Sequence, residues 1–444
     1  MTRWAALLGT LTAALWAPAL AAAAPVLMIS VDGLRPGDVL EADKRGLKLP
    51  NLTRLAADGV YASGVRNALP TDTYPNHTTL ITGVWPARHG IADNVVFDPL
   101  RTNMGGWYWY AADIKVPTLW DAAHKAGKRV ASFSWPVSVG AASIDDNIPE
   151  YWRAKTPDDL KLIRALATPG LVPELEKATG LPMLLTMGGN VQSDDGRATY
   201  AAAEIAAKHP ALTTIHLQAL DGAQHRYGPG SPETRAVLER QDAIIGRLVA
   251  AARAAEPDLV VAVVSDHGFA PLEHDVNILS AFVEAGLITL DPKTGRVTAW
   301  EAMPWGTVSA PVYLKRPDDP ALRAKVAALL ALLAARPELG VNRVVEAQEI
   351  ARLGGVPQAS FWIDFKPGYG GGDDARAPTV APSVEKGEHG YLPEHPQMRA
   401  TFILAGPGVA AKGALGEVDM RDIAPTLAKI LGVALPSAEG KPLF

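Results

Sequence analysis

The sequence predicts an α/β fold in which helices flank both faces of a mostly parallel central sheet. Three short runs are apolar along almost their whole length: VLMISVDG (26–33), TTIHLQALDG (213–222) and LVVAVVSDHG (259–268). Runs of this length that are rich in valine, isoleucine and leucine are typical of strands buried on both faces. Amphipathic helical patterns separate these runs, and such alternation of strand and helix is characteristic of a parallel sheet.

The expected helices carry apolar residues at every third or fourth position. The clearest are PNLTRLAADGV (50–60), PTLWDAAHKAG (117–127), DDGRATYAAAEIAAKH (194–209) and SPETRAVLERQDAIIGRLVAAARAA (231–255). Another helix is expected to begin near Pro75, within ALPTDTYPNHTTLITG (68–83), because threonine and asparagine side chains cap helix starts and proline is tolerated there. The same start would also suit a nucleophilic hydroxyl, since the free N–H groups of a first turn favour an anion.

Residues 275–375 are expected to form a smaller, cap-like insertion. Within this range LITLDPKTGRVTAW (287–300) predicts a hairpin, and DPALRAKVAALLALLAAR (319–336) predicts an amphipathic helix. The run ATFILAGPGV (400–409) is then expected to return the chain to the main sheet before a last helix, MRDIAPTLAKILGV (420–433).

Composition limits the classes of partner. The 444 residues are 48% hydrophobic and 20% charged, which is ordinary for a globular protein with a large core. The formal net charge is -5 and no basic block occurs, so neither duplex nucleic acid nor an anionic membrane surface is an expected partner. Small phosphorylated substrates stay compatible with this charge.

Residues 1–24 are expected to be a cleavable signal peptide. Arg3 precedes an apolar run that Pro18 interrupts, and the small residues Ala21–Ala24 follow. A membrane anchor is the weaker interpretation, because the run is short and no other segment reaches the roughly 20 apolar residues of a membrane span. The mature chain, residues 25–444, is therefore expected to be periplasmic or secreted, with a core large enough to need no disulfide.

Each of the three apolar runs closes on an aspartate: Asp32, Asp221 and Asp266. Ligands of open α/β sheets collect outside the carboxyl ends of the strands, so these side chains are expected to converge. Crowded carboxylates repel one another and are costly to desolvate unless a cation neutralises them. Metal binding is the simplest explanation, although each Asp-Gly pair alone is more often a turn.

Three histidines are placed to share such a site. His225 follows Asp221 by four residues, His267 follows Asp266 directly, and His389 lies in a polar, glycine-flanked loop. Mixed imidazole and carboxylate ligands suit zinc, and less well manganese or iron, whereas magnesium prefers oxygen alone. Other histidines are not expected at the site, because they lie in helix or strand patterns with no carboxylate at ligand spacing: His124, His209 and His216.

Several motifs, taken in order, resemble the nucleotide pyrophosphatase/phosphodiesterase family of the alkaline phosphatase superfamily. They are VDGLRP (31–36), PTDTYPNHTTLITGVWPARHGIADN (70–94), DGAQHRYGP (221–229), SDHGF (265–269), GEHGY (387–391) and VDMRDIAPTLAKILGV (418–433). The resemblance covers nearly the whole mature chain. It implies an alkaline phosphatase-like fold and a centre of two Zn²⁺ ions per chain.

The resemblance also implies roles for individual residues. Asp221, His225 and His389 match the ligands of one zinc ion. Asp32, Asp266 and His267 match those of the other. Thr73 matches the nucleophile, which also contacts metal, and Asn94 matches the asparagine that holds a phosphoryl oxygen. Tyr74 matches an aromatic position that packs against the leaving group.

The implied reaction is zinc-dependent hydrolysis of phosphodiester or pyrophosphate bonds through a phosphothreonine intermediate, with a nucleotide or another small phosphodiester as substrate. A phosphomonoesterase or phosphonate hydrolase on the same two-zinc scaffold is the alternative. A monoesterase must bind a dianionic phosphoryl group, which normally brings in additional Arg or Lys, and the sequence shows no such residue beside Thr73 or Asn94. A third possibility is a zinc-binding protein without catalysis, in which Thr73→Ala would change no activity.

Overall fold

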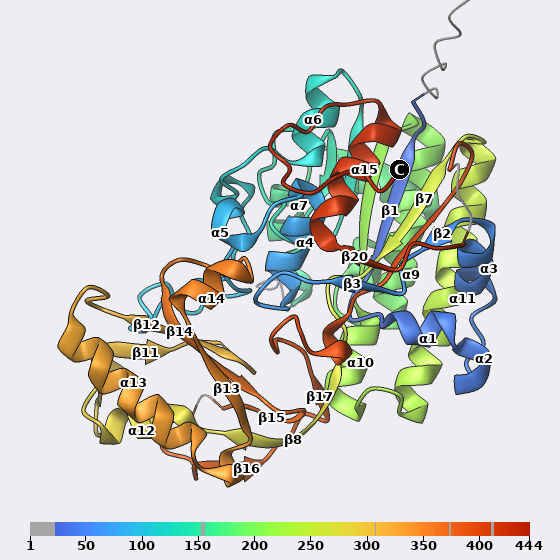
Figure 1. Ribbon diagram of the computed structural model, residues 1–444. Coiled ribbons are helices and arrows are strands. Elements are labelled where there is room, and N and C mark those ends of the chain that lie inside the picture. Colours follow the sequence, from blue (N-terminus) through green and yellow to red (C-terminus); the bar gives the residue numbers. More distant parts are fainter. Residues whose placement is uncertain (1–22, 152–155, 307, 373, 410–412) are drawn as a thin grey trace, which may run out of the picture.

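The computed structural model describes residues 23–151, 156–306, 308–372, 374–409 and 413–444. All but the last two residues of the expected signal peptide, 1–24, lie outside this described part. The chain forms a large α/β lobe and a smaller lobe built from the middle of its second half (Figure 1). Within the described residues, no helix is both long enough and apolar enough to cross a membrane.

An eight-stranded sheet forms the centre of the large lobe. Its strand order is β19 (Gly413–Ala414), β2 (Val60–Tyr61), β18 (Phe402–Ala405), β7 (Val260–Val264), β1 (Val26–Val31), β6 (Leu212–Leu217), β4 (Val130–Phe133) and β5 (Asp146–Ile148). The strands from β7 to β5 run parallel, and β18 is antiparallel to both of its neighbours. The expected mostly parallel sheet is confirmed.

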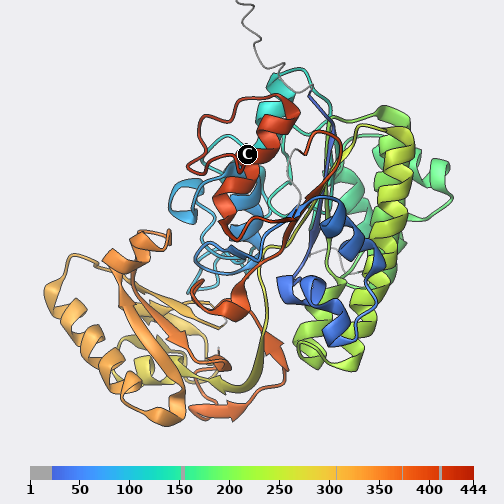
Figure 2. The ribbon, with the colours of Figure 1, turned by 45° about the vertical axis from the view of Figure 1, so that its right-hand side comes forward.

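Helices cover both faces of this sheet, as Figure 2 shows. One face packs against α3 (Pro50–Asp58), α9 (Val191–Lys208) and α11 (Pro232–Ala255). The other packs against α4 (Thr73–Thr82), α6 (Leu119–Lys125) and α15 (Ile423–Leu431). Residues of β1 alternate between these two cores, because successive side chains of a strand point to opposite faces.

Shorter elements complete the large lobe. The helices are α1 (Pro36–Leu40), α2 (Ala42–Arg45), α5 (Pro86–His89), α7 (Leu160–Leu166), α8 (Leu171–Thr179) and α10 (Ala219–Tyr227). Strands β3 (Gly64–Arg66) and β20 (Glu417–Asp419) pair in parallel beside the main sheet.

The small lobe contains an antiparallel sheet of four strands with its own core. Their order is β11 (Ala302–Pro304), β12 (Ala310–Leu314), β14 (Ala359–Phe365) and β13 (Val341–Glu346). Around it lie α12 (Ile278–Glu284), α13 (Pro320–Ala334), α14 (Ala347–Arg352) and the hairpin β9 (Ile288–Leu290) with β10 (Val297–Trp300). Strand β8 (Ala270–Val276) leads into this lobe and pairs with β15 (Gly368–Gly371), β16 (Val380–Pro382) and β17 (Gly387–Glu388).

Two local expectations were wrong. Strand β6 ends at Leu217, so Asp221 does not close a strand but lies in the first turn of α10. Helix α4 begins at Thr73, close to the expected start near Pro75, but the expected side-chain capping is absent, because the N-cap residue, Asp72, makes no side-chain capping bond. Two threonines of α4 instead return hydrogen bonds within the helix, Thr78 Oγ1 to the Tyr74 carbonyl oxygen and Thr82 Oγ1 to the Thr78 carbonyl oxygen.

Candidate active site

The site lies at the carboxyl edge of the central sheet, where five segments meet. Asp32 directly follows β1, and Asp266 and His267 follow β7. Helix α10 supplies Asp221 and His225 from one face, because residues four apart lie one turn above the other. The loop after β17 supplies His389, and α4 supplies Thr73 at its first position. All seven predicted ligand residues therefore meet in one place.

The turn after β1 orients two carboxylates. Gly33 has a φ of 69°, a left-handed conformation that favours glycine. Its N–H donates to Asp266 Oδ1 over 3.2 Å. The other oxygen of Asp266, Oδ2, lies 3.2 Å from His267 Nε2. The Asp32 Oδ1 atom lies 3.3 Å from the same nitrogen, so both carboxylates face His267.

Helix α10 begins where Asp194 accepts hydrogen bonds from its first free N–H groups. Asp194 Oδ1 accepts from Gln218 N over 2.9 Å, and Oδ2 accepts from Ala219 N over 3.0 Å. These N–H groups have no partner inside the helix, so the buried aspartate supplies one. This cap explains why the chain leaves β6 early and carries Asp221 into the site on a helix.

The three histidines share one orientation. Their Nδ1 atoms lie near backbone carbonyl oxygens, at 3.2 Å for His225 to Gly387, 3.1 Å for His267 to Gly268 and 3.1 Å for His389 to Thr71. A carbonyl oxygen only accepts, so each Nδ1 carries a proton, which leaves Nε2 as the nitrogen that could bind a metal ion. Such hydrogen bonding of the outer nitrogen is usual for metal-binding histidines.

Asp32, Asp266 and His267 place their ligand atoms within 4.8 Å of one another, as the predicted grouping requires. Thr73 Oγ1 lies 3.3 Å from His267 Nε2, so the hydroxyl adjoins this group. The Thr73 side chain is buried, with 9% of the residue exposed. The hydroxyl is thus held beside ligand atoms rather than turned into solvent.

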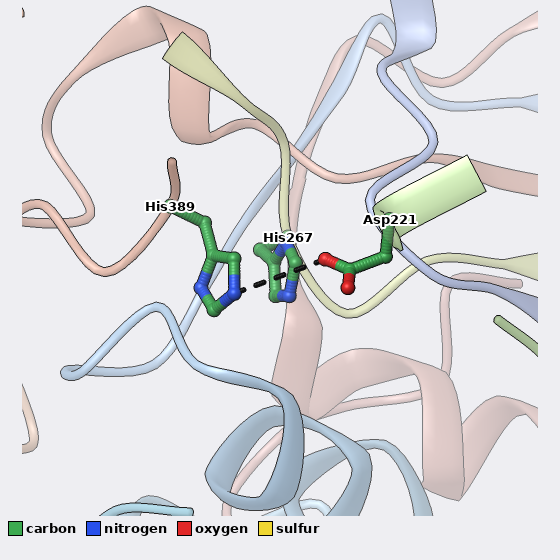
Figure 3. A group of neighbouring side chains, drawn as sticks. All are labelled: Asp221, His267 and His389. Atoms are coloured by element: carbon green, nitrogen blue, oxygen red, sulfur yellow. Dashed lines mark ion pairs between the residues drawn. The ribbon is translucent and has the colours of Figure 1, made fainter. Parts of the chain in front are cut away.

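The predicted ligands Asp221, His225 and His389 are divided between two overlapping groups of side chains in the structure. Asp221, His267 and His389 cluster within 4.8 Å, with the two imidazole rings stacked 3.7 Å apart (Figure 3). His225 Nε2 lies 3.3 Å from Asp221 Oδ1. His225 and His389 form a further group with Glu388, whose Oε2 lies 3.0 Å from His225 Nδ1. Glu388 is therefore an unpredicted carboxylate that contacts a predicted ligand.

Buried carboxylate oxygens of the site fit a cation. Asp32 Oδ1, Asp221 Oδ1 and Asp266 Oδ2 have no hydrogen-bond partner among the described residues. An unpaired buried carboxylate oxygen is costly, and a metal ion is the partner that could satisfy all three. Burial and the neighbouring carboxylates of Asp266 and Asp221 raise the pKa of Asp32 well above its ordinary value. This donor set of carboxylate oxygens and imidazole nitrogens suits zinc.

The imidazoles respond to the same charges. Burial lowers the pKa of His389, but the Asp72 and Glu388 carboxylates outweigh it and raise the pKa to about 9. Burial likewise opposes the Asp221 and Glu388 carboxylates at His225, whose pKa is raised well above 6.5. The pKa of His267 is lowered by burial and then by the positive charge of His389.

Asn94 joins the site through the start of α4. Its Oδ1 accepts a hydrogen bond of 2.8 Å from Tyr74 N, the N–H that follows Thr73. This bond occupies the amide oxygen and leaves the Nδ2 group out of it. Asn94 is thereby held beside the residue that follows the nucleophile candidate.

Comparison with known proteins decides the family. Residues 26–358 match the family "Type I phosphodiesterase / nucleotide pyrophosphatase". The chain belongs to this family. The resemblance seen in the motifs is confirmed, and the match includes every predicted site residue except His389.

Curated relatives of this phosphodiesterase family share part of the chain. Ectonucleotide pyrophosphatase/phosphodiesterase family member 1 of Homo sapiens is 26% identical over 254 residues, which are 55% of this chain and 23% of that protein. A venom phosphodiesterase of Macrovipera lebetinus is 25% identical over 236 residues, 51% of this chain and 23% of its own. The matched segment thus spans about a quarter of either relative.

Solved structures agree in fold. Human ectonucleotide pyrophosphatase/phosphodiesterase 5 superposes with a TM-score of 0.67 at 19% identity, covering 94% of this chain and 97% of that one. An inactive variant of the murine protein, solved in complex with AMP, superposes with a TM-score of 0.66 over the same shares. The alkaline phosphatase-like architecture expected for the family is confirmed.

Tyr74, the predicted leaving-group contact, is buried in this family member. The residue has 0% exposed surface, and its hydroxyl donates to Glu150 Oε1 over 2.8 Å. The Trp107 ring packs edge-on against it at a centroid distance of 5.2 Å. A leaving group could reach the Tyr74 ring only after a neighbouring side chain had moved, so the structure does not place this residue on an open surface.

His216 contacts the site although the sequence argued against it. Its Nε2 lies 2.9 Å from Asp32 Oδ2, and its Nδ1 lies 2.9 Å from Glu150 Oε2. The carboxylates are distant in sequence, so local spacing could not reveal them. One signal was available: β1 and β6 pair in parallel with Ser30 opposite His216, which puts His216 on the same side as Asp32.

His77 supports the start of α4, and its Nδ1 also lies 3.4 Å from Oδ2 of the predicted ligand Asp266. Its Nδ1 lies 2.8 Å from the Thr73 carbonyl oxygen, and its Nε2 lies 2.9 Å from Ser30 Oγ. Burial and the positive charge of His216 lower the pKa of His77 to about 3. A neutral His77 therefore ties the backbone of Thr73 to β1.

Proposed function

We propose that this protein hydrolyses phosphodiester or pyrophosphate bonds of small substrates, with Thr73 as nucleophile beside a centre of two zinc ions. The observation that carries the proposal is the surrounding of His267 Nε2, where Thr73 Oγ1, Asp32 Oδ1 and Asp266 Oδ2 all lie within 3.3 Å. A hydroxyl packed beside candidate metal ligands is suited to attack on phosphorus once a metal ion lowers its pKa.

The predicted ligands would hold the ions in two adjoining groups. Asp32, Asp266 and His267 would hold one. Asp221, His225 and His389 would hold the other, because Asp221 Oδ1 lies 3.3 Å from His225 Nε2 and 3.9 Å from His389 Nε2. Glu388 lies within reach of His225. Zinc bound there would lower the pKa of the Thr73 hydroxyl and offset negative charge on the phosphoryl group.

The chain's own residues then account for the geometry of the reaction. Thr73 Oγ1 attacks phosphorus in line, the bond to the leaving oxygen breaks, and a phosphothreonine forms that water later hydrolyses. The Asn94 amide donates to an equatorial phosphoryl oxygen, because its carbonyl side is already held by Tyr74 N. In the first turn of α4, Tyr74 N is held by Asn94, Pro75 has no N–H and Asn76 N bonds to the Asp72 carbonyl oxygen, so Thr73 N is the group that could favour the same negative charge.

Two basic residues that could have recognised a dianionic monoester are engaged elsewhere. Arg35 donates to both oxygens of Asp38, over 2.8 and 2.9 Å. Lys386 Nζ donates to the Ser383 carbonyl oxygen over 3.2 Å. These contacts favour the monoanionic phosphoryl group of a diester over the dianionic group of a monoester. Nucleotides are candidate substrates, because the murine structure named above contains AMP.

A substrate panel tests the proposal. Zinc-loaded protein is expected to hydrolyse bis(p-nitrophenyl) phosphate and a p-nitrophenyl ester of a nucleoside 5′-phosphate with a higher kcat/KM than p-nitrophenyl phosphate. Both kinds of substrate release the same chromophore, so the phosphoryl charge is the main difference between them. A preference for the monoester would instead support the phosphomonoesterase alternative.

A further inference from the structure

His216, Glu150 and Asp32 form a buried row beside the proposed metal centre. Their exposed fractions are 1%, 4% and 4%, although all three are ionisable. His216 lies in the middle, with one ring nitrogen 2.9 Å from each carboxylate. Of these three residues, only Asp32 was predicted from the sequence to be functional. The row therefore adds two side chains to the site.

The hydrogen-bonding inventory determines how His216 must act. An ionised carboxylate only accepts, so both ring nitrogens of His216 donate, one to Asp32 Oδ2 and one to Glu150 Oε2. Glu150 is itself held in place. Its Oε1 accepts from the Tyr74 hydroxyl over 2.8 Å, and the Gln218 amide donates to its Oε2. His216 therefore has a firm anchor on the side away from the metal centre.

The consequence for Asp32 is a fixed direction of its carboxylate. Oδ2 is taken by His216, while Oδ1 has no hydrogen-bond partner among the described residues and lies 3.3 Å from His267 Nε2. Rotation of the carboxylate would break the bond to His216 and leave a buried donor unpaired, which is costly. One oxygen is thus reserved for the protein, and the other is presented to an ion.

We propose that His216, anchored by Glu150, is a positioning residue that presents Asp32 Oδ1 to one ion of the proposed zinc centre. This inference rests on the proposed function, because it concerns the same ligands. It goes further, because Glu150 contacts both His216 and Tyr74. The ligand Asp32 is thereby connected to the residue next to the nucleophile. Outer hydrogen bonds of this kind tune metal affinity by about 10- to 100-fold.

The test compares three variants of the full chain. His216→Gln cannot donate to both carboxylates, and Glu150→Gln keeps the shape of the anchor without its charge. Thr214→Val is the matched control, because Thr214 lies two residues before His216 on β6, is equally buried, and bonds to Ser132 Oγ rather than to Asp32. Zinc affinity is measured for each by competition with a chromogenic chelator, and the visible spectrum is recorded after loading with cobalt(II).

We expect wild type and Thr214→Val to bind two zinc ions with equal affinity. His216→Gln is expected to bind one of the two about 10- to 100-fold more weakly, with an altered cobalt spectrum, and Glu150→Gln to shift in the same direction. Unchanged affinities and spectra in His216→Gln would overturn the inference while leaving the proposed function intact. Should His216→Gln fail to fold, unchanged values in Glu150→Gln would overturn it equally. Absence of zinc binding by wild type would overturn the proposed function itself.

Discussion

Asn94 has the oxygen of its amide bound to the protein, and its Nδ2 group is the proposed donor to the substrate. Since Oδ1 accepts from Tyr74 N, Asn94→Asp preserves that bond and replaces the Nδ2 donor with a carboxylate oxygen. We expect kcat/KM for a phosphodiester to fall by about 10²- to 10³-fold, because a stabilising donor becomes a repelling charge. Zinc content is expected to stay at the wild-type value in the same preparation.

A charge-matched control separates this local effect from general electrostatics. Asn103→Asp adds the same charge to the same loop, at a more exposed position. Its kcat/KM is expected to stay within about twofold of wild type, because exposed charges are screened by water and salt. Equal losses in both variants would contradict the role given to Asn94.

The sequence correctly indicated that site residues located just after the parallel strands would lie close together. Asp32, Asp266 and His267 follow directly after parallel strands, and such ends meet at one edge. His216, Glu150 and Glu388 were missed, because each acts through a partner that only the folded chain brings near. Tyr74 was assigned by motif, and its burial depends on packing by Trp107 that no motif encodes.

At the scale of elements, the position of Asp221 depends on the cap of α10. Asp194 accepts from two N–H groups of this helix start, and its partner Arg197 is buried as well, with Nη1 2.8 Å from Asp194 Oδ1. Asp194→Ala would leave a buried arginine without this carboxylate. We expect the free energy of unfolding, measured by urea titration, to fall by about 3–5 kcal/mol.

The adjacent residue provides the comparison. Asp195 forms only a solvent-exposed pair with Arg247, and such pairs contribute at most about 1 kcal/mol. Asp195→Ala is therefore expected to unfold within about 1 kcal/mol of wild type. A cost for Asp194→Ala as small as that for Asp195→Ala would show that the cap does not hold α10.

The helices and strands themselves were largely predictable. Amphipathic patterns identified α3, α6, α9, α11, α13 and α15, and the hairpin of β9 and β10 followed from its turn residues. The end of β6 was not predictable, because the apolar run continues through Leu220. Only the buried Asp194, which is distant in sequence, gives the chain a reason to turn into a helix there.

At the scale of the whole molecule, stability is expected to depend on pH through a partly buried cluster that contains none of the candidate metal ligands. Lys208 Nζ forms ion pairs with three carboxylates, those of Asp146, Glu174 and Glu204, at 3.0, 3.0 and 3.2 Å. Arg129 Nη2 also pairs with Asp146 over 2.7 Å, so two cations face three carboxylates. Burial, followed by the charge of Asp146, accordingly raises the pKa of Glu204 from 4.5 to about 7.

The sign of the effect follows from this shift. The folded protein binds the Glu204 proton more tightly than the unfolded chain does, so the stabilisation is complete below pH 4.5 and is lost as the pH rises through about 7. Glu204→Gln removes this titration. From pH 5 to pH 8, the wild type is expected to lose unfolding free energy relative to Glu204→Gln. A difference that stays constant across this range would contradict the assignment.

The two lobes meet around the loop that carries His389. Ser309 Oγ, from the small lobe, donates to the Gly390 carbonyl oxygen, and Asp364 Oδ1 accepts from Leu392 N over 3.1 Å. The small lobe therefore braces a predicted metal ligand of the large one. The boundaries of the expected insertion, 275–375, stay a prediction, whereas the sheet and helices of that region are visible in Figure 1.

The most direct measurement of the central claim is identification of the residue that carries the phosphoryl group during turnover. Zinc-loaded wild type is mixed with a chromogenic phosphodiester, quenched in acid and analysed by peptide mass spectrometry, alongside Thr73→Ala and Thr73→Ser. We predict an adduct on Thr73 in wild type, an adduct on the serine in Thr73→Ser, and a loss of turnover above about 10³-fold in Thr73→Ala with unchanged zinc content. Near wild-type turnover by zinc-loaded Thr73→Ala would contradict the account.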